Sequence, residues 1–238
     1  MRKRILAAVL AVCIVAIGVV TAVRGVRHRD SVAASSTNYW SGGLTLIIDA
    51  GHGGADGGAV SITGVPESEF NMDIAKRAEL IAAFFGVNTV MTRYSDDLAY
   101  SETSTTLRKM KSEDQQRRLA LINGTERAVL LSIHQNTYPS SGPHGAQVLY
   151  APTERSAEWG KTMQELLTAT LDPTNTRAAI RIQDTILLMN HIKCPAILVE
   201  CGFLSNVREE ALLRTDAYRL KVAATLIAGY LQSINNLQ

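Results

Sequence analysis

A short apolar run that leads into a glycine-dense loop is the feature that most restricts how this chain can fold. Residues 44–48 are apolar, and the loop after them contains five glycines together with His52, Asp49 and Asp56. Glycine permits unusual backbone angles and close approach of other groups, so a loop of this kind after a strand often holds a ligand near the main chain. The spacing excludes a dinucleotide fingerprint, because Asp56 stands at the sixth position counted from Gly51 and no helical pattern opens directly afterwards. A histidine at a tightly turned strand end instead suits a metal ligand.

The first 30 residues are predicted to form a membrane anchor or signal segment with basic flanks. Residues 5–23 contain no charged side chain and lie between two clusters of basic residues. As a helix this stretch would be about 28 Å long, close to the hydrocarbon thickness of about 30 Å. A cleaved signal peptide is the alternative, because residues 20–22 form a weak small-residue cleavage site. We expect an uncleaved transmembrane helix, although the balanced charges leave its orientation open.

The charge of the rest of the chain argues against a nucleic-acid partner. The whole sequence has 24 basic and 22 acidic residues, and six of the basic ones lie within residues 1–30. Without that segment, 18 basic and 21 acidic residues remain, a net charge of −3. The formal positive charge therefore belongs to the membrane flank, and no nucleic-acid-binding patch is expected.

Strand-like and helix-like segments alternate along the remainder of the chain. Residues 31–43 are small and polar, which is typical of a tether, and residues 44–238 are expected to form one domain. We predict an α/β fold with an open, mainly parallel or mixed central sheet covered by helices on both faces. The expected strands are 44–48, 87–92, 128–133, 147–150, 185–189 and 196–200. The expected helices are 66–85, a helix capped by Ser112 and ending at Ile122, 154–171 and 216–231, while 93–113 is mainly an irregular insertion.

Chemically active side chains follow three of these predicted strands. Asp49 and His52 come after the first strand, His134 after the strand at 128–133, and Glu200 at the end of the strand at 196–200. Ligands bind outside the carboxyl ends of parallel strands in an open α/β sheet, so these side chains are expected to converge. Glu67, at a helix start beyond the glycine loop, can face the same edge. Two histidines and a carboxylate are the ligand set of a catalytic zinc site, and a further carboxylate would act as general base.

Each of these residues also has an ordinary interpretation when taken alone. Glu200 could be a strand end that emerges into water, although burying a carboxylate there would be costly without a partner. His52 or His134 could be a hydrogen-bonded loop residue, and Glu67 could be a first-turn acid favoured by the helix dipole. Their joint placement favours the metal site. The two later histidines are expected in loops, the second being a reserve ligand: His144 and His191.

Several motifs occur in the order expected for a known enzyme family. They are Asp-Ala-Gly-His-Gly-Gly at 49–54, Glu67 with Asn71, Thr92-Arg93, Arg118 with Asn123, Ser-Ile-His-Gln-Asn at 132–136, and the run from Pro195 to Asn206. On these motifs the chain resembles the zinc-dependent N-acetylmuramoyl-L-alanine amidases often called amidase-3, over about residues 44–231. Ala50 departs from the proline more usual at that position, which should leave metal ligation undisturbed.

The resemblance implies a role for each matching residue. His52, Glu67 and His134 would bind Zn²⁺, and Glu200 would be the catalytic carboxylate. Zinc lowers the pKa of its bound water towards about 7 and polarises the scissile carbonyl. Glu200 would take the water proton during attack on the lactyl amide and pass it to the departing L-alanine amine.

Three further residues are expected near the ligands. Asn71 and Asn136 could orient ligands or substrate, and Asp49 could accept a histidine N–H as its supporting partner. Ordinary turn or capping roles are the alternative for all three.

The insertion near residues 100–114 also resembles the spore-cortex branch of the family, as does an N-terminal apolar segment without recognisable wall-binding repeats. This resemblance implies removal of stem peptides from muramic acid ahead of muramic lactam formation. The catalytic domain would act outside the cytoplasm, either membrane-anchored or secreted, in the intermembrane space of a developing spore. The implied partners are peptidoglycan glycan strands and stem peptides, and the membrane. Because the three metal ligands come from a loop, a helix start and a strand end, an unidentified protein partner could help to bring them together.

Two other functions remain open from the sequence. The first is another zinc hydrolase of the cell wall, such as a peptidase or a carbohydrate deacetylase, which shares the metal chemistry but cleaves a different bond. The second is a wall-binding protein with a degenerate site.

Overall fold

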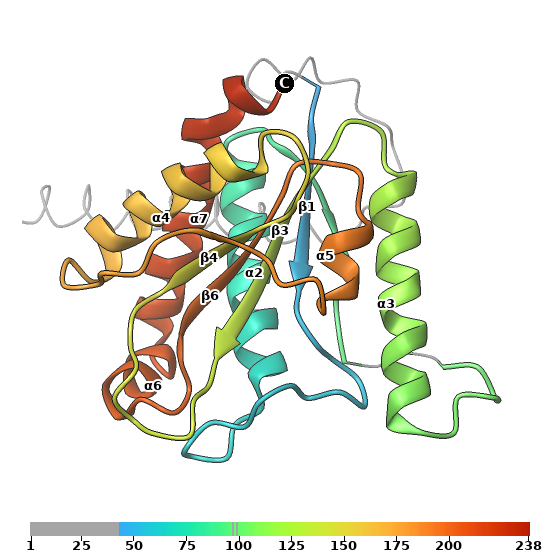
Figure 1. Cartoon of the computed structure of the whole chain (residues 1–238), viewed down its shortest axis with the longest axis horizontal. Helices are drawn as coiled ribbons and strands as arrows, with labels where there is room; N and C mark the ends of the chain where they lie inside the picture. Colours follow the sequence, from blue (N-terminus) through green and yellow to red (C-terminus); the bar gives the residue numbers. More distant parts are fainter. Residues whose placement is uncertain (1–42, 97, 99) are drawn as a thin grey trace, which may run out of the picture. The chain divides into compact units, whose positions relative to one another are not determined.

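A six-stranded mixed sheet runs through the middle of the domain (Figure 1). The computed structural model describes residues 43–96, 98 and 100–238. The predicted anchor at 1–30 and all of the predicted tether except Gly43 lie outside the described residues, so these two predictions stay untested.

The strand order is β2-β1-β3-β6-β4-β5. The strands are β1 (Thr45–Ala50), β2 (Asn88–Met91), β3 (Ala128–Asn136), β4 (Gln147–Tyr150), β5 (Ile180–Arg181) and β6 (Ala196–Phe203). The first four strands in the spatial order run parallel, whereas β4 is antiparallel to β6 and parallel to β5. The central strands are buried along nearly their whole length, as expected for a sheet with both faces covered. The prediction of an α/β fold is confirmed, and the sheet is mixed.

Helices cover both faces of the sheet. They are α2 (Glu67–Phe84), α3 (Leu107–Gly124), α4 (Ser156–Leu171), α5 (Leu187–His191), α6 (Val207–Leu213) and α7 (Asp216–Leu237). Because side chains alternate along a strand, Leu46 and Ile48 pack in a core with α2, α4, α6 and α7, whereas Ile47 packs with α3 and α5. The parallel strands bring the starts of α2 and α3 to the same edge of the sheet, where the glycine loop lies (Figure 1).

Three central strands are longer than the sequence predicts. Parallel pairing continues past the apolar residues, with Asp49 opposite Ser132 and His134 opposite Glu200. The backbones of these polar residues continue the parallel pairing, whereas the hydrophobic pattern alone predicts that each strand ends earlier. The predicted site residues Asp49, His134 and Glu200 therefore lie inside strands.

Three helical segments correct the sequence prediction. Helix α3 begins at Leu107, within the stretch expected to be irregular, because Thr106 caps it by accepting from Lys109 N. Only Arg118 and Ile122 of α3 are buried, so the helix lacks the apolar stripe that reveals a helix in a sequence. The segment 185–189, expected to be extended, includes the start of the short helix α5, and α6 was not predicted. Short apolar runs do not distinguish a strand from a helix.

Among residues 43–96, 98 and 100–238, no helix has the length and apolar character needed to cross a membrane.

Candidate functional site

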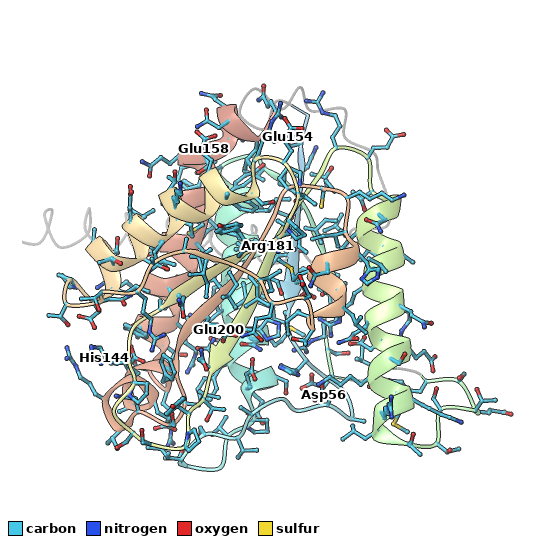
Figure 2. All side chains as sticks on the ribbon, viewed as in Figure 1. Asp56, His144, Glu154, Glu158, Arg181 and Glu200 are labelled. Carbon is cyan, nitrogen blue, oxygen red and sulfur yellow. The ribbon has the colours of Figure 1, made fainter. Side chains whose placement is uncertain are left out.

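The carboxyl edge of the parallel strands gathers the predicted site residues. His134 on β3 is the register partner of Glu200 on β6, and Asp49 lies near the end of β1. His52 follows β1 in the glycine loop with a positive φ of 59°, and Glu67 is the first residue of α2. Figure 2 shows Glu200 on the sheet and Asp56 in the loop beside α3, both far from Glu154 and Glu158 at the opposite end.

His52, Glu67 and His134 form a group whose ligand atoms all lie within 4.8 Å of one another. Glu67 bridges the two histidines: its Oε2 lies 3.2 Å from His52 Nε2 and its Oε1 lies 3.0 Å from His134 Nδ1. The two imidazole rings meet edge to face with centroids 5.0 Å apart. Two imidazole nitrogens and a carboxylate oxygen fit a divalent metal such as zinc, and they leave coordination positions for water or substrate. This is the one group of this kind within the part of the chain that the structure describes.

The charges of this group depend strongly on each other. Burial acts to lower the pKa of His52, but its contacts with Asp56 and Glu67 outweigh burial and raise that pKa to about 9. Burial acts to raise the pKa of Glu67, whereas His134 and His52 hold it well below its usual range. Glu67 is therefore ionised, whereas His52 would have to release its proton before a cation could bind to it.

Glu200 is the one acid of the site that is kept away from a partner. Its Oε2 is buried and accepts no hydrogen bond from any described residue. Burial raises the pKa of Glu200 to about 7, while the nearby His134 acts against that rise. A carboxyl group with a free oxygen and a pKa near neutrality is suited to accept and return a proton.

Two glycines allow the loop to pack against His52, Glu67 and His134. A Cβ atom at Gly51 would overlap the His134 ring, and one at Gly58 would overlap Glu67 and His52. Gly58 also has a positive φ of 72°, which disfavours other residues. The glycines of the loop thus make room for these three side chains.

Glu67 Oε1 accepts hydrogen bonds from two amide groups. Asn71 Nδ2, one turn along α2, donates to Glu67 Oε1 at 3.2 Å and to the Gly51 carbonyl at 3.1 Å. The backbone N–H of Gln135 also donates to Glu67 Oε1 at 3.0 Å, and the Gln135 side chain donates to Asn71 Oδ1 at 3.2 Å. The Asn71 side chain can therefore orient the Glu67 carboxylate. Asn136 instead caps its own turn, with Oδ1 accepting from the next backbone N–H at 2.8 Å.

Asp49 does not support a histidine, which corrects the sequence interpretation. Its carboxylate lies within the base of the site and accepts hydrogen bonds from Thr92 Oγ1 at 2.7 Å, Ser132 Oγ at 2.6 Å and Arg118 Nη1 at 2.5 Å. Burial acts to raise the pKa of Asp49, but these partners lower it to about 2. The buried guanidinium of Arg118 attracts the carboxylate more strongly than a neutral imidazole can, so Asp49 has a structural role.

The residue that supports His52 is Asp56, to which the sequence interpretation gave no role. Asp56 Oδ2 lies 2.9 Å from His52 Nδ1, and this contact with His52 holds the pKa of Asp56 well below its usual range. A carboxylate on the outer nitrogen of a ligand imidazole fixes the ring and its tautomer. Its position four residues after His52, in a loop noted for two aspartates, was the available signal.

Two buried arginines were also missed. Arg93 donates to the carbonyls of Ala50 and Gly51, and Arg118 donates to the carbonyls of Ala50 and His52. Both belong to motifs of the resemblance, but no sequence signal shows that an arginine in a polar stretch points inward.

The other two histidines lie outside the metal-binding group. His144 Nδ1 contacts the Gly142 carbonyl, and His191 Nδ1 contacts the Leu187 carbonyl; both residues are exposed. They are loop and helix-end residues, as expected for His144, and His191 is not a reserve ligand in this arrangement.

Known proteins resemble this chain along most of its length. Residues 46–232 match the family model described as N-acetylmuramoyl-L-alanine amidase. A germination-specific N-acetylmuramoyl-L-alanine amidase of Bacillus subtilis is 38% identical over 195 residues, which cover 80% of this chain and 79% of that protein. The N-acetylmuramoyl-L-alanine amidase LytC of the same species is 29% identical over 79% of this chain, but the match covers 35% of LytC.

A solved structure has the same fold. The CwlD amidase of Clostridioides difficile, determined in complex with the GerS lipoprotein, superposes with a TM-score of 0.76 and 32% sequence identity. The match covers 82% of this chain and 100% of that chain.

Proposed function

Because the chain belongs to the N-acetylmuramoyl-L-alanine amidase family and is a peptidoglycan hydrolase, we propose that it cleaves the lactyl amide of muramic acid at a zinc site formed by His52, Glu67 and His134. The observation that carries this assignment is the convergence of three metal-binding atoms beside a buried carboxylate oxygen without a partner. A metal bound there would have Glu200 as its neighbour across the β3–β6 ladder.

Different side chains of the protein have different roles in the proposed hydrolysis. A zinc ion held by His52, Glu67 and His134 would supply Lewis acidity, which would polarise the carbonyl and make water a better nucleophile near neutral pH. Glu200 takes a proton from the attacking water and returns it to the departing L-alanine nitrogen. Its burial supports this role, because a carboxyl group with a pKa near 7 can serve in turn as base and acid. Asn71 and Asp56 hold Glu67 and His52 in place.

The likeness to a germination-specific amidase supports a more specific substrate. We propose that the chain removes stem peptides from cortex peptidoglycan of the developing spore, exposing muramic acid residues for muramic lactam formation by a separate deacetylase. The N-terminal apolar segment would hold the catalytic domain outside the cytoplasm, in the intermembrane space. Because the similar CwlD amidase was solved in complex with a lipoprotein, an extracytoplasmic protein partner is part of this proposal.

Mass spectrometry of digested peptidoglycan tests the reaction. The expected products are free stem peptides with an L-alanine amino terminus and glycan strands with bare muramic acid. Intact stems with missing acetyl groups would show a deacetylase, and shortened stems would show a peptidase. Sacculi that bind the protein but stay uncut would show a wall-binding protein.

Metal analysis of the same purified chain tests the site separately. We expect about one zinc per chain after reconstitution, and loss of hydrolysis when a chelator removes it. A fully active protein without metal would contradict the proposed ligand roles.

A further inference from the structure

The segment that runs from the end of β2 into helix α3 contacts the loop that carries His52. Four of its side chains contact the loop: Arg93, Tyr100, Lys111 and Arg118. The two arginines are buried and bind backbone carbonyls, which fixes the path of the loop. Tyr100 and Lys111 contact the outer side of the loop and remain partly exposed.

Lys111 contacts the atom that supports the metal ligand. Its Nζ lies 2.9 Å from Asp56 Oδ2, and the same oxygen lies 2.9 Å from His52 Nδ1. Asp56 Oδ1 is used separately, accepting from Gly58 N at 3.3 Å. Lys111, Asp56 and His52 therefore form a chain of contacts that runs from α3 to the metal-binding group.

Each of these three residues has a distinct role in the series of contacts. With Nδ1 facing Asp56, His52 presents Nε2 towards Glu67 at 3.2 Å, which is the side where a metal would be bound. The backbone of Asp56 is held by two hydrogen bonds with Gly53, but its side chain is one-fifth exposed, so the position of its carboxylate depends on a few side-chain contacts. Lys111, on helix α3, holds the Asp56 carboxylate in place through its ammonium group.

We propose that Lys111 is a positioning residue for the metal ligand His52, acting through Asp56, so that the placement of the first turns of α3 sets the affinity of the site for zinc. This inference rests on the zinc site proposed above. Coupling of this kind is reciprocal: if the lysine contact favours metal binding, bound metal favours the contact and steadies the start of α3.

The test uses the full-length chain in detergent, stripped of metal, with zinc affinity measured by competition against a chromophoric chelator. Loss of an outer partner of a metal ligand typically weakens binding by about 10–100-fold. We expect about a tenfold loss for Lys111→Met, near-wild-type affinity for Lys111→Arg, and at least a tenfold loss for Asp56→Asn. The matched control is Arg108→Met, an exposed cation on the first turn of the same helix, which should change nothing.

The double variant Asp56→Asn/Lys111→Met distinguishes positioning through Asp56 from a general charge effect. If Lys111 acts through Asp56, the double variant binds zinc as weakly as Asp56→Asn alone. Multiplied losses, or an affinity for Lys111→Met within twofold of wild type, would overturn the inference. Metal-free Lys111→Met should also match the wild type in its urea unfolding midpoint, because a merely structural role would lower it.

Amide hydrogen exchange gives an independent readout. Zinc should slow exchange in the first turns of α3 in the wild type, and this protection should be lost in Lys111→Met. Equal protection in both proteins would count against the coupling. A wild-type chain that binds no zinc at all would instead refute the proposed function, so the two failures are distinguishable.

Discussion

On the strand side of the site, His134 and Glu200 are register partners in the β3–β6 ladder, whereas on the loop side His52 depends on Asp56 and the residues around it. A strand residue can move only if the sheet pairing shifts, which would also turn its neighbours to the wrong face. A loop residue is held by a few side-chain contacts, each of which can be lost without unfolding the domain. Substitutions on the strand side should therefore change the chemistry, and those on the loop side should change metal affinity or local stability.

The largest expected effect separates chemistry from metal binding on the strand side. Glu200→Gln keeps the size of the side chain but removes its ability to take a proton, so turnover should fall by about 10²–10⁴-fold while zinc content is unchanged. Release of stem peptides, followed by mass spectrometry, and metal analysis measure the two quantities. Glu154→Gln, at the opposite end of the domain, is the control. Turnover above a tenth of wild type would remove Glu200 from its catalytic role.

A substitution at the base of the glycine loop should lower the free energy of unfolding. Arg118→Met leaves the buried carboxylate of Asp49 without its cation, and breaking such a pair costs about 3–5 kcal/mol. Urea unfolding of the metal-free protein measures the loss. Arg117→Met is the matched control, because its contacts with Asp114 and with the ring of Tyr100 are partly exposed, so its loss should stay under about 2 kcal/mol. Equal losses in the two variants would show that Asp49 is not stabilised by Arg118.

Gly51, on the loop side of the site, packs against His134 on the strand side. The added methyl group in Gly51→Ala would overlap the His134 ring, so we expect a loss of about 1–3 kcal/mol in unfolding free energy. Zinc should also stabilise this variant less than the wild type, because the ring is displaced. Gly142→Ala, where a methyl group meets nothing within 4 Å, should change neither thermal stability nor the zinc effect. Indistinguishable melting curves for the two variants would contradict the contact.

The smallest effect should appear only in acid. The pKa of Asp49 is lowered from 3.8 to about 2 in the folded protein, so its ionised form favours folding. This contribution is complete above about pH 4 and is lost as the pH falls towards 2, and it amounts to about 2 kcal/mol. Unfolding free energies measured between pH 5 and 2 should therefore fall less steeply in Asp49→Asn than in the wild type. Parallel curves would show that another group carries the acid sensitivity.

The sequence revealed the strand side of this site better than its loop side. The apolar runs before His134 and Glu200 predict strands, and the convergence rule for parallel sheets then brings both residues to one edge. The roles of Lys111 and Arg118 depend on contacts with segments 50 or more residues away, for which spacing gives no rule. Asp56, four residues after His52, is the loop-side partner that spacing could have indicated. The first turns of helix α3, before Ser112, escaped prediction because they bury no apolar residue, whereas sequence patterns report apolar periodicity.

The partnerless oxygen of Glu200 also decides which molecules the site can accept tightly. A buried acceptor that stays unpaired costs about 1–3 kcal/mol, so a ligand that brings a donor to this oxygen gains that amount over one that does not. Water and a departing amine each provide such a donor, whereas an ester oxygen or a thioether at the same place does not. Competitive inhibitors of this enzyme should therefore combine a metal-binding group with an N–H or O–H aimed at Glu200.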